Sequence, residues 1–148
     1  MEDVLIVGGG PAGLMAADYL SKLNLKITIV DQLPPMGRKD LQAATSGLNL
    51  TPDEPLDAFL KNFSNNNPQL IDALKNFTSS DVADWANSLG IDLFTGSTGR
   101  VFPIQMKASP LLRAWLTQLD KRGVKRRHKR QAISCLLYTS PSPRDLTT

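Results

Sequence analysis

The residues with the clearest chemical use form a glycine-rich run near the N-terminus, GGGPAG at positions 8–13. Gly8 would allow a tight turn, Gly10 would let a pyrophosphate approach because it has no Cβ, and Gly13 would let a helix pack closely on a strand. Pro11 costs no hydrogen bond in the first turn of a helix, whose free N–H groups favour phosphate. Asp31 lies 18 residues past Gly13 and can accept hydrogen bonds from an adenosine ribose. This spacing predicts a dinucleotide site.

The elements around the run match what such a motif requires. Residues 3–7 (DVLIV) are a short apolar run typical of a buried parallel strand. Apolar residues from Leu14 to Leu23 form one helix face that ends near Asn24, and residues 27–30 (ITIV) predict a second strand closed by Asp31. The pattern predicts an α/β fold with a Rossmann-like unit of parallel strands and a right-handed crossover. The alternative is a glycine-rich turn beside a charged strand end.

The rest of the chain has a different pattern. A proline-bent loop at 32–39 leads into an irregular stretch that ends at Thr51. Apolar spacing then predicts three helices with Trp85 and the phenylalanines in the core, and a hairpin; the helices span 53–63, 68–77 and 80–89, and the strands span 91–95 and 100–102. A last helix, capped by Ser109 and Pro110, would stop at Gly123, and Val124 would begin a third parallel strand.

Length and composition exclude several classes of protein. The chain has 148 residues, of which 41% are hydrophobic and 21% charged, so it is not a wholly disordered chain. No apolar run approaches the roughly 18 residues that a membrane span needs. Met1 is followed by Glu2 and Asp3 rather than by the basic residues of a signal peptide. We therefore predict a soluble, cytoplasmic protein with no membrane partner.

Charge is distributed unevenly along the chain. Residues 1–120 hold 9 Lys/Arg and 13 Asp/Glu, whereas residues 121–130 (KRGVKRRHKR) hold 7 Lys/Arg and no acid. Such a run can bind nucleic acid. No aromatic residue interrupts it, Gly123 lies inside it, and cations are favoured at the end of a helix. We favour a solvated helix end followed by a strand over a nucleic-acid site.

The C-terminal segment matches no structural pattern. Residues 135–145 (CLLYTSPSPRD) resemble the translation of a transposon-end adapter used in preparing sequencing libraries. We therefore predict that residues 134–148 are a non-native tail that packs on nothing and that the native sequence is interrupted near Ile133. Cys135, the only cysteine, then says nothing about the redox compartment of the native protein.

No catalytic acid, base or nucleophile can be assigned from the residue types. His128 is the only histidine and lies in the basic run, where an exposed ring is expected. The sequence has no spacing of His, Cys or paired carboxylates typical of a metal site. The catalytic residues therefore stay unknown.

Several segments together resemble a known family. The chain resembles FAD-dependent oxidoreductases with two dinucleotide-binding domains in five places along the sequence. These are VLIVGGGPAGLMAA, the acid Asp31, MGRK, GLNLT and the later GRVFPIQMKASPLLRAWL. The similarity is greatest to the NAD(P)/FAD-dependent oxidoreductases of the BaiN/HI0933-like, aminoacetone-oxidase type. It spans about residues 3–130. The family uses flavin for hydride chemistry, so the protein's role would be to position that cofactor.

The resemblance implies a cofactor-binding set. It assigns the glycine run to the FAD pyrophosphate, Asp31 to the ribose with Gln32 beside it, and Arg38 and Lys39 to the phosphates or flavin. Alternatively, Arg38 and Lys39 are simply two solvent-exposed cations of a loop. Asn49 and Thr51 match the family's flavin-side segment. Where the family has glycines, this chain has Ala44, Thr45 and Ser46, whose side chains would narrow the approach to the flavin. The full set is Gly8, Gly10, Pro11, Ala12, Gly13, Asp31, Gln32, Arg38, Lys39, Asn49 and Thr51.

The same resemblance divides the chain into segments. Residues 1–52 would be the FAD-binding Rossmann-like unit, 53–107 a mostly helical insert with a short hairpin, and 108–133 a helix and strand that return to the nucleotide-binding domain, which is incomplete at its C-terminus. The chain would be the N-terminal part of an FAD-dependent oxidoreductase, inactive by itself.

Electrons would pass from NAD(P)H through flavin to an acceptor that the sequence does not define. A flavin monooxygenase or oxidase is the alternative in the same class. An NAD-binding dehydrogenase is disfavoured by the GRK loop and the long segment after the second strand. A nucleic-acid-binding module using residues 121–130 is the alternative of another class. The expected partner is a small-molecule substrate whose identity the sequence does not specify, and the oligomeric state is not specified either.

Overall fold

The computed structural model describes residues 1–43, 47–64 and 67–134. Residues 44–46 and 135–148 lie outside the described residues, so the expectations for Ala44, Thr45 and Ser46 and for the C-terminal tail stay predictions. Within the described residues, no helix is both long and apolar enough to cross a membrane.

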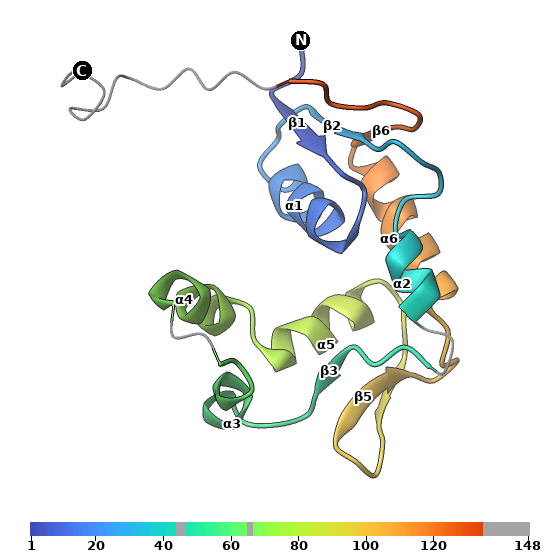
Figure 1. The fold of residues 1–148 in the computed structure, drawn as a ribbon. Coiled ribbons are helices and arrows are strands. Elements are labelled where there is room, and N and C mark those ends of the chain that lie inside the picture. Colours follow the sequence, from blue (N-terminus) through green and yellow to red (C-terminus); the bar gives the residue numbers. More distant parts are fainter. Residues whose placement is uncertain (44–46, 65–66, 135–148) are drawn as a thin grey trace, which may run out of the picture.

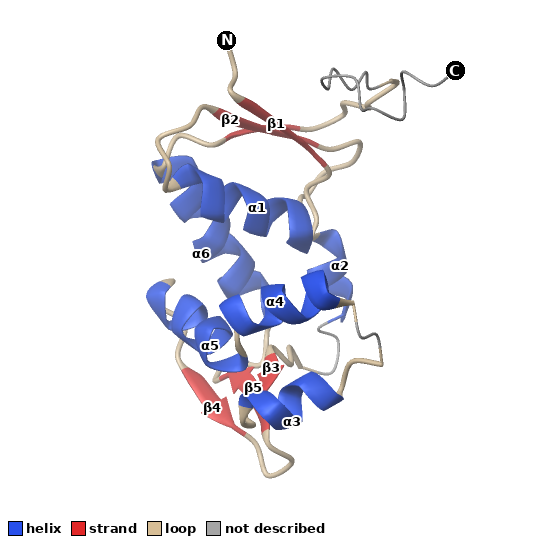
Figure 2. Ribbon diagram, turned by 90° about the vertical axis from the view of Figure 1, so that its left-hand side faces the viewer, coloured by secondary structure: helices blue, strands red, loops and turns tan. Residues whose placement is uncertain are grey.

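The first layer of the fold is a parallel sheet. It contains β1 (Val4–Val7), β2 (Ile27–Val30) and β6 (Lys125–Arg127), in the order β1-β2-β6. Both neighbouring pairs are parallel. Helices α1 (Pro11–Ser21) and α6 (Ala108–Lys121) lie against one face of this sheet, as Figure 2 shows. The predicted Rossmann-like α/β unit is therefore confirmed, including its third parallel strand.

The apolar pattern of the sequence accounts for this layer. Val4 and Ile6 alternate toward the helices and pack on the core, while Leu5 and Val7 on the other face are about 60% exposed. The core consists of buried side chains from both helices, from β2, from the loop before α2 and from the residue before β6: Leu14, Ala17, Ile27, Ile29, Met36, Leu112, Trp115, Leu119 and Val124. Burial of these side chains holds α1 against β1 and thereby fixes the turn that joins them.

The second layer lies below the first in Figure 1 and is formed by the segment between β2 and α6. Its sheet is antiparallel, with the order β3-β5-β4. Its elements are α2 (Arg38–Ala43), β3 (Thr51–Pro52), α3 (Leu56–Lys61), α4 (Pro68–Asn76), α5 (Ser79–Ser88), β4 (Leu93–Thr95) and β5 (Arg100–Pro103). The three predicted helices and the hairpin are present. The hairpin also pairs with a third strand, β3. This strand was not predicted, because two residues are too few to show an alternating pattern.

Several local expectations were wrong. Residues 38–43 form a short helix rather than an irregular stretch. Helix α1 ends at Ser21 instead of near Asn24, which has a positive φ of 56°. Ser109 does not cap α6, because the helix starts earlier, with Lys107 at the N-cap.

The predicted core was also partly wrong. Phe77 and Phe94 are 40% and 41% exposed rather than buried. Trp85 is half-buried and packs edge-on against Trp115, with ring centroids 4.7 Å apart. The aromatic content of the insert therefore overstated its core, because several rings lie at the borders of cavities.

Candidate functional site

The glycine run turns directly from β1 into α1, as its spacing predicts. Gly8 has a φ of +109°, a backbone conformation that suits glycine. A Cβ on Gly13 would lie 1.9 Å from the Gly8 carbonyl oxygen, so only glycine allows the helix to approach the strand this closely. A Cβ on Gly10 would meet no atom within 4 Å. Gly10 therefore faces open space, as a backbone that a ligand approaches must do.

Gly9, which the motif treats as variable, also has a structural role. A Cβ there would lie 2.5 Å from Cγ of Met36, a side chain that is 1% exposed. The Gly37 N–H donates to the Gly9 carbonyl oxygen at 2.7 Å. The loop before α2 thus packs on the glycine turn. The sequence offers only a weak signal for this contact, the Met36-Gly37 pair after two prolines.

Asp31 lies at the carboxyl end of β2, next to this turn. Its Oδ2 accepts a hydrogen bond from the Gly9 N–H at 2.6 Å, and its Oδ1 accepts one from the Leu33 N–H at 3.0 Å. The Nη1 of Arg38 lies 3.7 Å from Oδ1. The hydrogen bonds from Leu33 and Gly9, followed by the charge of Arg38, lower the pKa of Asp31 below its ordinary value. The expected position of Asp31 is confirmed, and its carboxylate stays ionised.

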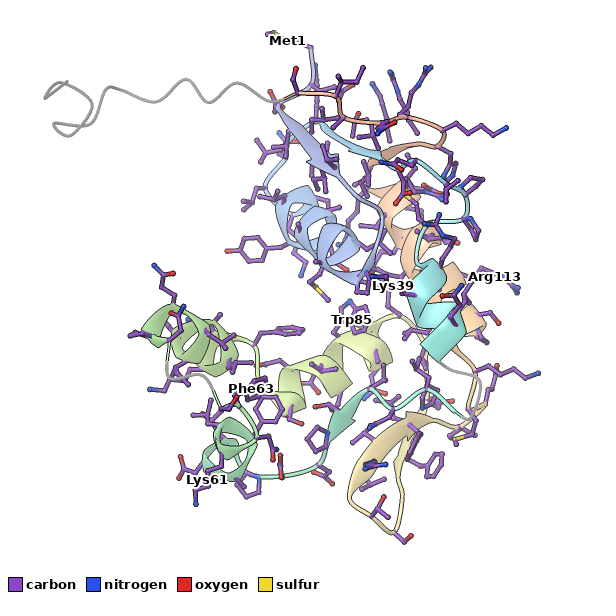
Figure 3. All side chains as sticks on the ribbon, in the orientation of Figure 1. Met1, Lys39, Lys61, Phe63, Trp85 and Arg113 are labelled. Carbon is purple, nitrogen blue, oxygen red and sulfur yellow. The ribbon has the colours of Figure 1, made fainter. Side chains whose placement is uncertain are left out.

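These residues surround one opening, which we call the glycine-loop cleft. It has a volume of about 350 Å³. Its lining combines the turn and first residues of α1 with Asp31 and the loop leading into α2: Val7, Gly8, Gly9, Gly10, Pro11, Ala12, Gly13, Asp31, Pro35, Gly37, Arg38 and Lys39. Figure 3 shows Lys39 on α2 at the level of the glycine turn. Eight of the sequence-derived candidates therefore lie around a single cleft, namely Gly8, Gly10, Pro11, Ala12, Gly13, Asp31, Arg38 and Lys39.

The three remaining candidates, Gln32, Asn49 and Thr51, do not line this cleft. Gln32 is exposed on the loop after Asp31. Thr51 is 6% exposed in β3, where its Oγ1 lies 2.7 Å from the hydroxyl of Ser79. The Thr51 side chain thus joins β3 to α5 in the second layer.

Asn49 lines a second cavity, which is apolar and has a volume of about 410 Å³. Side chains from α1, α5 and α6 enclose it together with residues 48–50: Pro11, Ala12, Met15, Leu48, Asn49, Leu50, Phe77, Val82, Trp85, Ala108, Leu111, Leu112 and Trp115. Pro11 and Ala12 belong to both openings. The first turn of α1 therefore separates a polar cleft from an apolar cavity.

A buried carboxylate holds this arrangement together. Asp18 on α1 is 2% exposed, and its Oδ2 accepts hydrogen bonds from the indole N–H groups of Trp115 at 2.7 Å and Trp85 at 3.2 Å. The Nη1 of Arg122 lies 3.0 Å from its Oδ1. One side chain thus links α1 to α5 and α6. Sequence reasoning missed Asp18, because a lone acid on a helix resembles a solvent-exposed residue until its partners, 67 and 97 residues away in sequence for the two indoles, are placed.

The cleft has the features that a dinucleotide requires. The first turn of a helix presents N–H groups without intrahelical partners, together with a partial positive charge. Here that turn adjoins the open space at Gly10, two cations and an ionised carboxylate. No group of three or more His, Cys, Asp or Glu side chains within the described part of the chain could hold a metal ion. His128, expected to be exposed, is half-buried.

The comparisons with known proteins agree with this geometry. The family described as HI0933-like protein Rossmann domain matches residues 2–140. The chain therefore belongs to this family, and the resemblance to the FAD-dependent oxidoreductase class is confirmed.

Two curated relatives match the chain over stretches of different length. The ribosomal RNA dihydrouridine synthase of Haemophilus influenzae is 29% identical over 122 residues, which are 82% of this chain and 29% of that protein. The ferredoxin–NADP reductase of Streptococcus pneumoniae is 49% identical over 37 residues, 25% of this chain and 12% of that protein. The chain thus spans less than a third of the length of these relatives.

Two solved structures share the fold. THI4 of Thermovibrio ammonificans has a TM-score of 0.55 at 18% identity, and the match covers 86% of this chain and 38% of that one. A flavocytochrome c3 fumarate reductase in its open conformation has a TM-score of 0.54 at 19% identity, covering 86% of this chain and 26% of that one.

Proposed function

We propose that this chain is the part of an FAD-dependent oxidoreductase that binds the ADP moiety of FAD in the glycine-loop cleft. The single observation that carries the proposal is the exposure of Gly10 to open space between the start of α1 and the ionised Asp31. A negatively charged, extended ligand fits that arrangement. Membership of the HI0933-like family supports it.

Each part of the cleft has a distinct task in this proposal. The N–H groups of the first turn of α1, with Arg38 and Lys39, would hold the two phosphates. Asp31 would accept hydrogen bonds from the ribose, and its two backbone donors keep the carboxylate oriented for that purpose. Flavin, when bound, supplies the hydride chemistry. The catalytic groups of the whole protein are not assigned.

The electron donor that we propose is NAD(P)H. The similarity of 37 residues to a ferredoxin–NADP reductase supports this choice. The sequence alone indicated an unidentified small-molecule substrate. For the electron acceptor we now propose a specific chemical group.

We propose uridine in RNA as the electron acceptor. A relative whose match covers 122 residues, 82% of this chain, is named a ribosomal RNA dihydrouridine synthase. Reduction of the uridine ring consumes the hydride of one NAD(P)H and one proton, and it yields NAD(P)⁺ and dihydrouridine. This acceptor revises the interpretation of the sequence, which disfavoured a nucleic-acid partner.

A titration followed by NMR tests the cofactor proposal even if binding is weak. FAD and ADP should both shift the amide resonances of Gly10, Gly13 and Asp31, whereas FMN, which lacks the ADP moiety, should not. Shifts confined to other residues, or no shifts with either ADP-containing ligand, would contradict the proposal. The Gly10→Val variant serves as the negative control. Its side chain projects into the open cleft, so it should fold normally but lose the shifts caused by FAD and ADP.

A further inference from the structure

The basic run at 121–130 divides into paired and unpaired cations. Among the described residues, three of them form ion pairs at 2.7–3.0 Å: Arg122 with Asp18, Lys125 with Glu2, and Arg126 with Asp120. These three agree with the interpretation of a helix end followed by a strand. The other four cations of the run are exposed and have no acid partner in the described part of the chain: Lys121 at the end of α6, and Arg127, Lys129 and Arg130 at and after the end of β6. Of these four, Arg127, Lys129 and Arg130 lie beside Asp31. We call these three residues the basic rim.

The basic rim lies at the carboxyl end of the parallel sheet, next to the candidate site. The Asp31 N–H donates to the Arg127 carbonyl oxygen, and the Arg130 N–H donates to the Asp31 carbonyl oxygen, both at 3.0 Å. Lys129, between them, has a φ of +55°, so the chain turns sharply beside Asp31. In Figure 1 the segment after β6 continues from this turn along the sheet. The rim is thus held by backbone hydrogen bonds near the glycine-loop cleft.

The charge of the rim is not balanced locally. Asp31, whose backbone is hydrogen-bonded to Arg127 and Arg130, already accepts from two N–H groups through its carboxylate, which lies 3.7 Å from Arg38. Glu2 and Asp120 are paired with other cations of the run. The phosphates of the proposed cofactor have their own partners in α1, Arg38 and Lys39. Three positive charges therefore remain for a different anion.

The composition of the rim specifies the kind of contact. No Phe, Tyr or Trp occurs in residues 121–130, so the run offers no large aromatic ring on which bases could stack. Arginine and lysine contact phosphate oxygens, which position a nucleic acid without reading its sequence. We propose that the basic rim binds the sugar–phosphate backbone of RNA and brings the strand to the site. This inference rests on the proposed function, because it concerns the uridine-containing acceptor.

Salt-dependent RNA binding tests this assignment. The probe is a fluorescein-labelled oligouridine of about 20 nucleotides, and anisotropy gives its affinity between about 50 and 200 mM salt. The test variant replaces Arg127, Lys129 and Arg130 by Gln. The control replaces three exposed lysines outside the run by Gln, so that net charge changes equally: Lys26, Lys61 and Lys75. Figure 3 shows Lys61 on α3, in the second layer.

Losing three phosphate contacts should reduce the slope of log affinity against log salt by about 2 for a single strand. At about 0.1 M salt this corresponds to a loss of affinity on the order of 100-fold. The control variant should keep the slope of the wild-type chain. An unchanged slope in the rim variant, or an equal loss in the control, would overturn the proposal. So would rim-dependent binding to vesicles of anionic phospholipid without rim-dependent binding to RNA.

Flavin binding separates this inference from the function on which it rests. The rim variant should bind FAD and ADP like the wild-type chain. A parallel loss of FAD and RNA affinity would assign the rim to the cofactor and overturn the proposal. Rim-dependent RNA binding by a chain that binds no FAD would instead contradict the proposed function and leave the RNA surface standing.

Discussion

Two glycines of the same turn provide a sharp test of how this site is built. A methyl group on Gly13 would lie 1.9 Å from the Gly8 carbonyl oxygen, whereas a side chain on Gly10 would meet no atom within 4 Å. Gly10 also has an extended conformation, with φ −82° and ψ −174°, that other residues adopt without strain. We therefore expect Gly13→Ala to damage the fold and Gly10→Val to damage ligand binding only.

The magnitudes follow from these contacts. In Gly13→Ala the helix must move by about 1 Å or more, and such overpacking costs about 1–3 kcal/mol, occasionally more. The clash is with a backbone oxygen, which cannot rotate away, so we expect a cost at the upper end of this range, and the gain in helix propensity, about 1 kcal/mol, offsets only part of it. Gly10→Val should change the free energy of unfolding by less than about 1 kcal/mol. If valine displaces a phosphate from two N–H groups, each worth about 1.5–3 kcal/mol, the affinity for FAD should fall more than about 100-fold.

Urea unfolding and a ligand titration measure the two effects separately. Far-UV circular dichroism gives the free energy of unfolding of each variant, and the NMR titration with ADP or FAD gives the affinity. Equal stability of Gly13→Ala and wild type would refute the argument from close packing. Undiminished FAD affinity in a folded Gly10→Val variant would remove the main support for the cofactor site.

Three further predictions follow from single side chains. Asp18→Leu leaves two indole N–H groups without their acceptor and Arg122 without its carboxylate partner, so urea unfolding should show a loss of about 3–5 kcal/mol, and Asp18→Asn a smaller one. The lowered pKa of Asp31 means that its ionised form stabilises the fold above about pH 4 and loses this effect as pH falls through the lowered value; the stability difference from Asp31→Asn should therefore be constant above about pH 5 and shrink in acid. Thr51→Val should cost about 1 kcal/mol through the lost contact with Ser79 and leave ADP affinity unchanged, whereas a loss of affinity would place Thr51 in the site.

The part of the fold that sequence reasoning predicted well depends on local patterns. The strands at 4–7 and 27–30 are short apolar runs. The turn between the first strand and α1 needs glycine because of the backbone conformation of Gly8, the open space at Gly10 and the close packing at Gly13. The position of Asp31 follows from parallel pairing, which brings the carboxyl ends of neighbouring strands to one edge. Local rules and the tertiary structure agree in this unit, so the sequence was sufficient.

The rest depends on contacts between distant segments. Gly9 matters because Met36 packs on it, and β3 exists because residues 51 and 52 pair with β5. Neither contact leaves a periodic signal in the sequence. The placement of Thr51 shows the same limit: its match to a family segment gives no information on the direction of its side chain, which pairs with Ser79.

Asp18 connects the helix that borders the glycine-loop cleft to the side chains that line the apolar cavity. The first turn of α1 borders both the glycine-loop cleft and the apolar cavity, and Asp18, further along the same helix, binds Trp85 and Trp115, which line that cavity. A displacement of α1 by phosphate binding would therefore have to move the indole groups or break their hydrogen bonds. Because those bonds are made to a buried carboxylate, breaking them is costly. Helix α1 and the two tryptophans of the cavity wall are therefore expected to move together. The cavity would then keep a fixed position relative to any ligand held by the glycine turn.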